Sequence, residues 1–435
     1  MRTRLFVCLS ILFLPAVASL AAELSRDWPS FRGPDRSAVS KETGLLQKWP
    51  EGGPPLVWEV RGPGRGYSSL AVVDNRIFTL GDAPSIADDQ DEYLLAFDRD
   101  SGSPLWKLKT GSAWNQGQPN WQSSRSTPTV AGDLVYALTA HGELVCAEVA
   151  SGSERWRKNL MNDFGGTKGD HWGYSESVLI DGDRLICTPG GEKATMVALN
   201  KNTGETIWQT SRPGDRGAGH ASIVPSKIGG TRVYVQTTAS GPLGVRADDG
   251  KLLWTFDIDK TTAVIPTPIV RDDLVFFSAG YKRGGALLKQ VPSDDGEVKI
   301  ETIYPQDPKQ GLKTELANKH GGLVLIGDYV YGGKEDQNII FCAELMTGEI
   351  KWQDRGSGQA SAAVCAGDGC LYIHYANGQM SLVKAAPEKY EEVGSFMVPG
   401  SGERPSWAHP VIAGGHLYLR EQNRILCYDI RAAHQ

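Results

Sequence analysis

The chain has 435 residues, with 45 Lys and Arg against 51 Asp and Glu, which gives a formal net charge of −6. This mildly acidic balance, together with the absence of a Lys/Arg cluster, argues against nucleic acid or an anionic membrane surface as a partner. Gly is abundant, at 51 residues. Gly and Pro interrupt the chain about every ten residues, which is typical of many short strands.

The N-terminus has the pattern of a secretion leader. Two arginines stand within the first four residues, an apolar run covers residues 5–20, and small residues offer cleavage near Ala21 or Ala22. The apolar run is too short to favour a membrane span. Cys8 suggests a lipoprotein anchor, but Val7 before it is too large for that signal. We expect an exported protein, periplasmic or otherwise extracytoplasmic, with no lipid anchor and no membrane span.

A short motif then repeats along the chain, in which a Gly is followed four residues later by a Trp, as in "SGSPLWKL" and "TGETIWQT". The Trp residues at this position are Trp58, Trp106, Trp156, Trp208, Trp254 and Trp352. Successive intervals are 48, 50, 52 and 46 residues, and the last is 98, or twice 49. The double interval indicates a hidden unit ending near Ile300, and a degenerate copy ends near Phe396.

Each interval contains three further short apolar or alternating runs separated by turn residues such as Gly-Asp, and no convincing helical period. Four strands per unit and eight units predict an all-β fold, an eight-bladed β-propeller of four-stranded antiparallel blades. The C-terminal end offers three strands without a Trp strand. We therefore expect residues 55–60 to supply the outer strand of the last blade and so to close the ring.

This organisation divides the chain into a signal peptide over residues 1–22, an extended N-terminal segment over 23–54 and the propeller over 55–435. Within each unit, the Gly is expected to form a tight turn that needs positive φ. The Trp should lie on the outer strand, bury its ring between blades and find an acceptor for its N–H.

The repeat resembles the pyrroloquinoline quinone (PQQ) repeat superfamily, from about Trp28 to Ile430. The segments "DWPSFRGPDRSAVS" and "RPSWAHPVIAGGHLYLR" are similar to exported PQQ-repeat proteins of planctomycete-type bacteria. The superfamily includes quinoprotein alcohol dehydrogenases and a non-catalytic propeller lipoprotein of the outer-membrane barrel-assembly machinery, and both have eight blades. The resemblance therefore implies the fold directly and leaves the chemistry open.

Loops that lead into the first strand of each blade should open on the mouth of the central channel. Polar and aromatic residues in these loops are candidates for ligand binding there: Arg125, Trp172, Tyr174, Glu176, His220, His320, Trp407 and His409. The alternative is that they satisfy turn backbones and water, or form a packed lid. No His or Cys pair has metal-ligand spacing, so no metal site is expected.

These observations favour an exported, non-catalytic propeller that acts as a binding or scaffold module, with no cofactor. Its partner would be a protein, or a small-molecule or carbohydrate ligand. The alternative is a PQQ-dependent alcohol or sugar dehydrogenase that uses PQQ with Ca²⁺. The chain lacks the adjacent Cys pair and the haem motif of such enzymes, and it also lacks the acylated Cys of the assembly lipoprotein.

Two local features leave alternatives open. Cys365 and Cys370 flank the turn "AGDG" and could form a disulfide across a hairpin in an oxidising compartment, or could remain free. The acidic residues in 88–92 could offer oxygen ligands to Ca²⁺, but their spacing does not match a calcium loop, which favours a solvated acidic loop.

Overall fold

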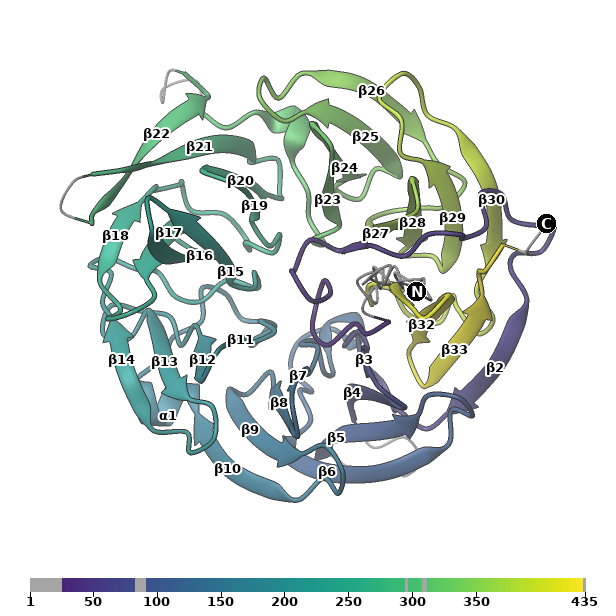
Figure 1. Cartoon of the computed structure of the whole chain (residues 1–435), viewed down its shortest axis with the longest axis horizontal. Coiled ribbons are helices and arrows are strands. Elements are labelled where there is room, and N and C mark those ends of the chain that lie inside the picture. Colours follow the sequence, from purple (N-terminus) through teal and green to yellow (C-terminus); the bar gives the residue numbers. More distant parts are fainter. Residues whose placement is uncertain (1–25, 83–90, 294–295, 307–310, 433–435) are drawn as a thin grey trace, which may run out of the picture.

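The computed structural model describes residues 26–82, 91–293, 296–306 and 311–432. Eight sheets surround a central axis, with the first strand of each unit near the axis and the last strand at the rim (Figure 1). Consecutive strands pair antiparallel in every blade, as the repeat predicts. The predicted signal peptide over residues 1–22 lies outside the described residues.

Blades 1–4 follow one another along the chain, each from its inner to its outer strand. Blade 1 comprises β3 (Ala71–Val73), β4 (Arg76–Asp82), β5 (Asp91–Asp98) and β6 (Pro104–Ser112). Blade 2 comprises β7 (Thr129–Ala131), β8 (Leu134–Leu138), β9 (Glu143–Glu148) and β10 (Glu154–Asn159). Blade 3 comprises β11 (Leu179–Asp181), β12 (Arg184–Cys187), β13 (Met196–Asn200) and β14 (Thr206–Thr210). Blade 4 comprises β15 (Val224–Ile228), β16 (Thr231–Thr238), β17 (Gly241–Arg246) and β18 (Leu252–Thr255).

Blades 5–7 repeat this order, and blade 8 combines both ends of the chain. Blade 5 comprises β19 (Ile269–Arg271), β20 (Leu274–Ala279), β21 (Gly284–Pro292) and β22 (Val298–Tyr304). Blade 6 comprises β23 (Leu323–Ile326), β24 (Tyr329–Lys334), β25 (Ile339–Glu344) and β26 (Ile350–Arg355). Blade 7 comprises β27 (Ala362–Gly367), β28 (Cys370–Tyr375), β29 (Gln379–Lys384) and β30 (Glu392–Met397). Blade 8 comprises β31 (Val411–Ala413), β32 (His416–Glu421), β33 (Arg424–Asp429) and β2 (Leu56–Arg61).

The described helices are short and lie in loops. The helix α1 (Leu160–Phe164) follows β10, and the side chain of Asn159 caps it by accepting hydrogen bonds from two backbone N–H groups. Single 3₁₀ turns cover Pro119–Trp121 and Thr314–Leu316.

The ring closes as the sequence predicts. Strand β2 pairs antiparallel with β33, with Trp58 opposite Cys427 and Val60 opposite Ile425. Figure 1 shows this purple N-terminal strand at the rim of the yellow C-terminal blade. Because the first and last parts of the propeller share one sheet, the ring has no terminal blade with an uncovered face.

The Gly and Trp of the repeat contact each other across blade interfaces. The indole of Trp208 in blade 3 lies against Gly250 of blade 4, where a Cβ would come within 2.5 Å of the ring, and Gly250 has φ +75°. The indole N–H of Trp208 donates to the backbone oxygen of Ala247 at 3.0 Å. Trp106 and Gly152 repeat this arrangement between blades 1 and 2. The repeat therefore encodes a contact between neighbouring units.

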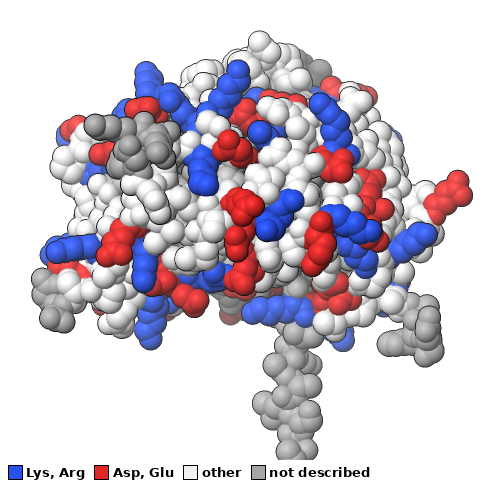
Figure 2. Space-filling model, turned by 90° about the horizontal axis from the view of Figure 1, so that it is seen from above, with Lys and Arg blue, Asp and Glu red and all other residues white. Residues whose placement is uncertain are grey.

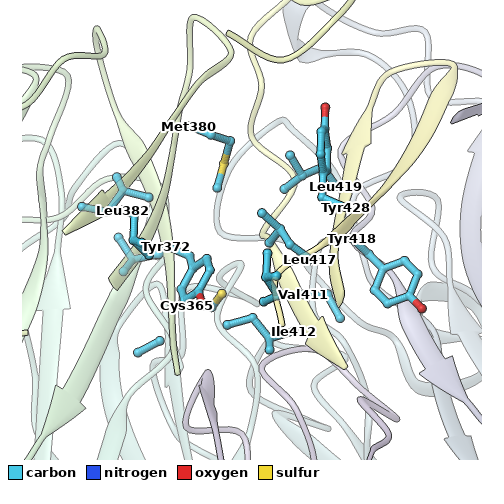
Figure 3. Close-up of a cluster of buried hydrophobic side chains, with 14 of the residues drawn as sticks. Cys365, Tyr372, Met380, Leu382, Val411, Ile412, Leu417, Tyr418, Leu419 and Tyr428 are labelled. Atoms are coloured by element: carbon cyan, nitrogen blue, oxygen red, sulfur yellow. The ribbon is translucent and has the colours of Figure 1, made fainter. Parts of the chain in front are cut away.

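Apolar side chains fill the rest of the space between blades. Figure 3 shows Cys365, Tyr372 and Leu382 of blade 7 facing Ile412 and other apolar residues of blade 8. All six described cysteines are buried and free, Cys365 and Cys370 among them. Cys365 stands opposite Tyr372 in the β27–β28 register, and Cys370 stands opposite Gly367. The two thiols are therefore not cross-strand partners, and the disulfide hypothesis is wrong.

Residues 26–54 cross the channel before β2 begins (Figure 1). The short strand β1 (Val39–Ser40) pairs in parallel with the inner strand β27. The buried guanidinium of Arg36 donates to the backbone oxygens of Ser177, Val178 and Ile223, which belong to blades 3 and 4. Arg32 donates to the backbone oxygen of Leu323 in blade 6. This segment therefore ties together the inner edges of opposite blades.

Acidic and basic side chains are interspersed on the face seen in Figure 2, without a large patch of either sign. Among the described residues, no helix combines the length and apolar character that a membrane span requires.

Candidate functional site

A cavity of about 580 Å³ opens at one end of the channel. Loops that precede the inner strands of blades 1–6 and 8 contribute to its wall, and Phe31 of the N-terminal segment also lines it. This volume lies in the range typical of small-ligand sites. Of the eight candidate residues, six line the cavity: Arg125, Trp172, His220, His320, Trp407 and His409.

The alternation of an extended chain decides which loop residues face the cavity. Residues four positions before an inner strand point into it in seven blades: Tyr67, Arg125, Ser175, His220, Ile265, Lys319 and Trp407. Residues two positions before the strand also line it in several blades, as Thr127 and His409 do. Side chains of an extended segment alternate between two faces, so the intervening residues point between the blades.

Glu176 is one of these intervening residues, and its predicted place at the channel mouth is wrong. Its side chain is 2% exposed and accepts hydrogen bonds from the N–H and hydroxyl of Thr188 and from the amide of Gln236 in blade 4. Burial raises the pKa of Glu176 to about 8 despite these hydrogen bonds. Glu176 therefore links two blades instead of facing a ligand.

Tyr174 is turned away from the cavity as well. It lies five positions before β11 and is 1% exposed, and its hydroxyl donates to the backbone oxygen of Pro189 at 2.8 Å. Its ring packs against Gly142 of blade 2. The predicted role of Tyr174 at the mouth is therefore also wrong.

Hydroxyl groups connect successive blades along the cavity wall. The backbone N–H of Thr127 donates to the hydroxyl of Ser177 at 2.9 Å, and the N–H of Ser177 donates to that of Ser222 at 3.0 Å. The N–H groups of Ser69 and Ser222 donate in the same way to Thr127 and Thr267. This chain of hydrogen bonds fixes the loops of blades 1–5, and therefore the side chains that they present.

Aromatic rings form two parts of the cavity wall. Trp121 and Trp172, from the loops before β7 and β11, meet nearly at right angles with ring centroids 5.5 Å apart. Trp407 stacks on His320 at 4.5 Å and 20°, and Tyr67 lies 4.8 Å from Trp407. The first group comes from blades 2 and 3 and the second from blades 1, 6 and 8, so aromatic rings from five blades line the cavity.

Arg125 holds the first aromatic group in place. Its guanidinium donates to the backbone oxygens of Trp121 and Trp172. Burial lowers the pKa of Arg125 to about 10, so it stays charged at neutral pH. No carboxylate among the described residues forms an ion pair with it.

His220 connects Ser175 of the cavity wall with Asp170, which lies outside the lining. Its Nε2 lies 2.8 Å from the Asp170 carboxylate, and its Nδ1 lies 2.7 Å from the hydroxyl of Ser175. Burial opposes ionisation of Asp170, but the attraction and hydrogen bond of His220 outweigh it and lower the pKa of Asp170. Hydrolase triads join the same three residue types, but with the two ring nitrogens exchanged. We interpret this chain as a polar connection between the loops of blades 3 and 4.

Two further histidines of the wall, His320 and His409, are neutral at physiological pH. Burial lowers the pKa of His320 to about 4 and that of His409 to about 3. Lys319 is paired with Asp336, and its ammonium also lies 5.0 Å from the ring centre of Tyr281. Within the described parts of the chain, no three His, Cys, Asp or Glu side chains gather in a way that could hold a metal ion.

Sequence reasoning missed several lining residues: Phe31, Ser175, Ile265, Tyr281, Lys319 and Asp336. The alternation rule would have found Ser175, Ile265 and Lys319, because each stands four residues before an inner strand. Phe31 could not be found in this way, since it reaches the cavity from the segment that crosses the channel.

Known proteins share both the sequence and the fold. The family model described as outer membrane protein assembly factor BamB matches residues 19–170 and 90–354. The BamB of Shewanella oneidensis is 26% identical over 243 residues, which cover 53% of this chain and 56% of that protein. The BamB of Yersinia pestis is 22% identical over 53% of this chain and 58% of its own length. The alignments thus span somewhat more than half of these relatives.

Solved structures agree on the fold. The crystal structure of BamB from Moraxella catarrhalis has a TM-score of 0.56 at 16% identity and covers 87% of this chain and 98% of its own. The quinohemoprotein alcohol dehydrogenase of Comamonas testosteroni has a TM-score of 0.62 at 11% identity and covers 95% of this chain and 82% of its own. At these identities the structures establish the fold alone. The sequence match covers most of the repeats, and the chain therefore belongs to the family described as outer membrane protein assembly factor BamB.

Proposed function

We propose that this chain is an extracytoplasmic, non-catalytic propeller that binds a partner at its mouth cavity and acts as a scaffold. The observation that carries the proposal is the cavity itself, whose wall is built from aromatic and polar side chains of seven blades and the N-terminal segment. The names of the family and of its relatives, assembly factors of the outer membrane, favour a protein partner.

The way the cavity is bounded supports binding over passage. Phe31 lines it, and its neighbours Arg32 and Arg36 anchor the N-terminal segment to inner strands of blades 3, 4 and 6. A segment held in this way obstructs the channel beneath the cavity. A partner that enters from the mouth would therefore meet a fixed floor.

The alternative, a PQQ-dependent dehydrogenase, finds less support in the side chains present. Such chemistry needs a flat site for the quinone, a divalent cation beside it and a base for the substrate hydroxyl. The cavity offers aromatic surfaces, but the described residues offer no cluster of acidic ligands for Ca²⁺. The residues therefore do not fit the PQQ–Ca²⁺ pair. Mixing the protein with both and following dye reduction with alcohols and aldoses tests this directly.

Site-specific photocrosslinking tests the scaffold proposal. A photoreactive phenylalanine analogue replaces His171, an exposed residue of the cavity rim, in protein expressed with its leader. The matched control carries the analogue at Ile207, which is 45% exposed on the outer strand β14. We expect defined protein adducts from position 171 and none of the same size from position 207. Equal adducts at both positions, or none at either, would contradict the proposal.

The proposed compartment rests on the leader-like N-terminus. Protein recovered from the exported fraction should begin near residue 22 or 23, which N-terminal sequencing determines. An intact leader in a cytosolic fraction would contradict this part of the proposal.

A further inference from the structure

We propose that the mouth cavity selects a ligand that carries one carboxylate on a flat, apolar ring, with the carboxylate bound by Arg125 and the ring held between the aromatic walls. The inference rests on the proposed binding function and names the chemistry of that site. The proposed ligand is an aromatic acid with a single carboxylate, unlike pyrroloquinoline quinone, which carries several.

The charges around the cavity point to an anion. Lys319 is already paired with Asp336, and Asp170 is bound by His220 and by the backbone N–H of Trp172. Setting aside the histidines, Arg125 is the one cationic lining residue within the described ranges that has no carboxylate in contact. Asp170 and Glu92 stabilise its charge only from a distance, so a carboxylate in direct contact with the buried guanidinium would stabilise it further.

The guanidinium of Arg125 is also oriented to bind a carboxylate. Two backbone oxygens hold its guanidinium in a fixed orientation, and those bonds use only part of its five N–H donors. Hydrogen bonds between a guanidinium and a carboxylate are shorter and stronger than neutral ones. Because the guanidinium is already oriented, little conformational freedom is lost when the anion binds.

Unsatisfied ring nitrogens lie in the same wall. Trp172 Nε1, His320 Nδ1 and His409 Nδ1 are buried and make no hydrogen bond within the described residues. Buried polar atoms in proteins rarely lack a partner, and such atoms at a cavity are expected where part of the polar contact comes from outside the chain. Because these nitrogens have almost no accessible surface, Arg125 remains the main polar group that a ligand would meet.

The rest of the wall fits a flat apolar body. Trp121 and Trp172 form a corner beside Arg125, and Trp407 presents a second aromatic surface from blade 8. A cavity of about 580 Å³ accommodates a bicyclic ring with a short acidic side chain. Trp121 and Trp172 thus contribute in two ways. Their backbone oxygens orient Arg125, which would bind the anion, and their rings form the aromatic surface beside it.

Calorimetry with a matched pair of ligands tests the proposal. Indole-3-propionate and its uncharged amide share the ring and the chain length and differ only in the terminal group, which is a carboxylate in one and a neutral amide in the other. We expect the acid to bind at least about tenfold more tightly than the amide, as a charge-assisted hydrogen bond predicts. Equal affinities, or a preference for the amide, would overturn the proposal.

Variants at position 125 assign the effect to this residue. Arg125→Gln should abolish the preference for the acid, whereas Arg125→Lys, which keeps the charge, should retain part of it. Arg157→Gln is the control, because Arg157 in the same blade also donates to two backbone oxygens, those of Lys109 and Thr110, but does not line the cavity and is paired with glutamates. Loss of the preference in the control, or its survival in Arg125→Gln, would contradict the assignment.

Two further ligands refine the result. Pyrroloquinoline quinone, which carries several carboxylates, should bind no more tightly than the monoacid, and tenfold tighter binding would overturn the single-charge proposal. A short peptide that ends in Phe, with a free or an amidated C-terminus, distinguishes the sources of the carboxylate. A preference for the free peptide identifies a chain terminus, and a preference confined to indole-3-propionate identifies a free small acid. The test uses purified protein without a partner, so its outcome is independent of the crosslinking result.

Discussion

Two regions of this propeller use the repeat in opposite ways. Between neighbouring blades the same contact recurs, because the Trp of one outer strand covers the Gly of the next blade and donates its N–H to a backbone oxygen there. At the mouth, equivalent positions differ from blade to blade: Tyr67 in blade 1, Arg125 in blade 2 and His220 in blade 4.

The difference distinguishes positions that stabilise the closed propeller from positions that would contact a ligand. Most blade interfaces have nearly the same shape, so the same residues suit each of them. The interface after blade 4 is an exception, because Trp254 donates to the side chain of Gln290 and no atom lies within 4 Å of a Cβ added at Gly296. A ligand in the channel lacks that symmetry, and each blade must therefore present a different group to it. Stability should respond to the repeated positions, and binding to the positions that vary.

Removing a repeated Trp should have the largest effect on stability. Trp208 is 7% exposed and fills the interface between blades 3 and 4. Trp208→Ala should lower the free energy of unfolding by about 3–5 kcal/mol, because a large buried ring leaves a cavity. Trp121→Ala at the cavity rim is the control and should change it by less than about 1 kcal/mol. Equal denaturant midpoints for the two variants would contradict the comparison.

The Gly beneath that ring gives the next largest effect. Gly250→Ala places a Cβ 2.5 Å from the Trp208 ring at φ +75°, and should destabilise the protein by about 2–3 kcal/mol. Gly132→Ala is the control for φ alone, because Gly132 has φ +60° and no atom within 4 Å of the added carbon, and should cost about 1 kcal/mol. In a Trp208→Ala background, the cost of Gly250→Ala should fall to that of the control. An unchanged cost would show that the contact is unimportant.

The pH dependence of stability probes a polar contact between blades. Burial raises the folded-state pKa of Glu176 to about 8, above the ordinary value of 4.5, so the folded protein holds a proton that the unfolded chain releases. This carboxyl therefore makes stability fall as pH rises from about 4.5 to 8. Glu176→Gln should reduce the fall by roughly 1–3 kcal/mol, as urea unfolding at pH 5 and pH 8 measures. Parallel pH profiles for parent and variant would refute the burial of this carboxyl.

The smallest effect should come from reduction. The six described cysteines are free and buried, so no disulfide between them contributes to ring closure. Reductant should leave the unfolding midpoint unchanged. Alkylation of the denatured protein without reductant should label both Cys365 and Cys370, as peptide mass spectrometry can show, and protection of this pair would reveal a disulfide.

The fold could be predicted from the sequence because its signals are local and repeated. The Gly–Trp spacing marks each outer strand, and the missing partner of the last three strands identifies residues 55–60 as the closing strand. The path of residues 26–54 through the channel could not be predicted, because Arg32 and Arg36 bind backbone oxygens of distant blades. Every residue has a backbone oxygen, so the identity of the partner residue gives no sign of such a contact.

The site was predictable in part. Position before an inner strand points to the correct loops, but only the two-residue alternation within each loop separates cavity-lining residues from Glu176 and Tyr174, which point away from the cavity. His320 departs from the alternation, because it lines the cavity three residues before its strand, next to Gly321 with φ +75° and stacked on Trp407. A local turn and a contact from another blade place it there, and neither follows from the sequence of its own loop.

The difference between the two regions can be measured in one experiment. The 12 tryptophans can be replaced by 5-fluorotryptophan and assigned by single Trp→Phe variants. On addition of indole-3-propionate, ¹⁹F resonances of Trp121, Trp172 and Trp407 should shift, whereas those of Trp106, Trp156, Trp208 and Trp352 should stay in place. Shifts at the blade interfaces, or none at the three cavity residues, would contradict the separation of binding from ring packing.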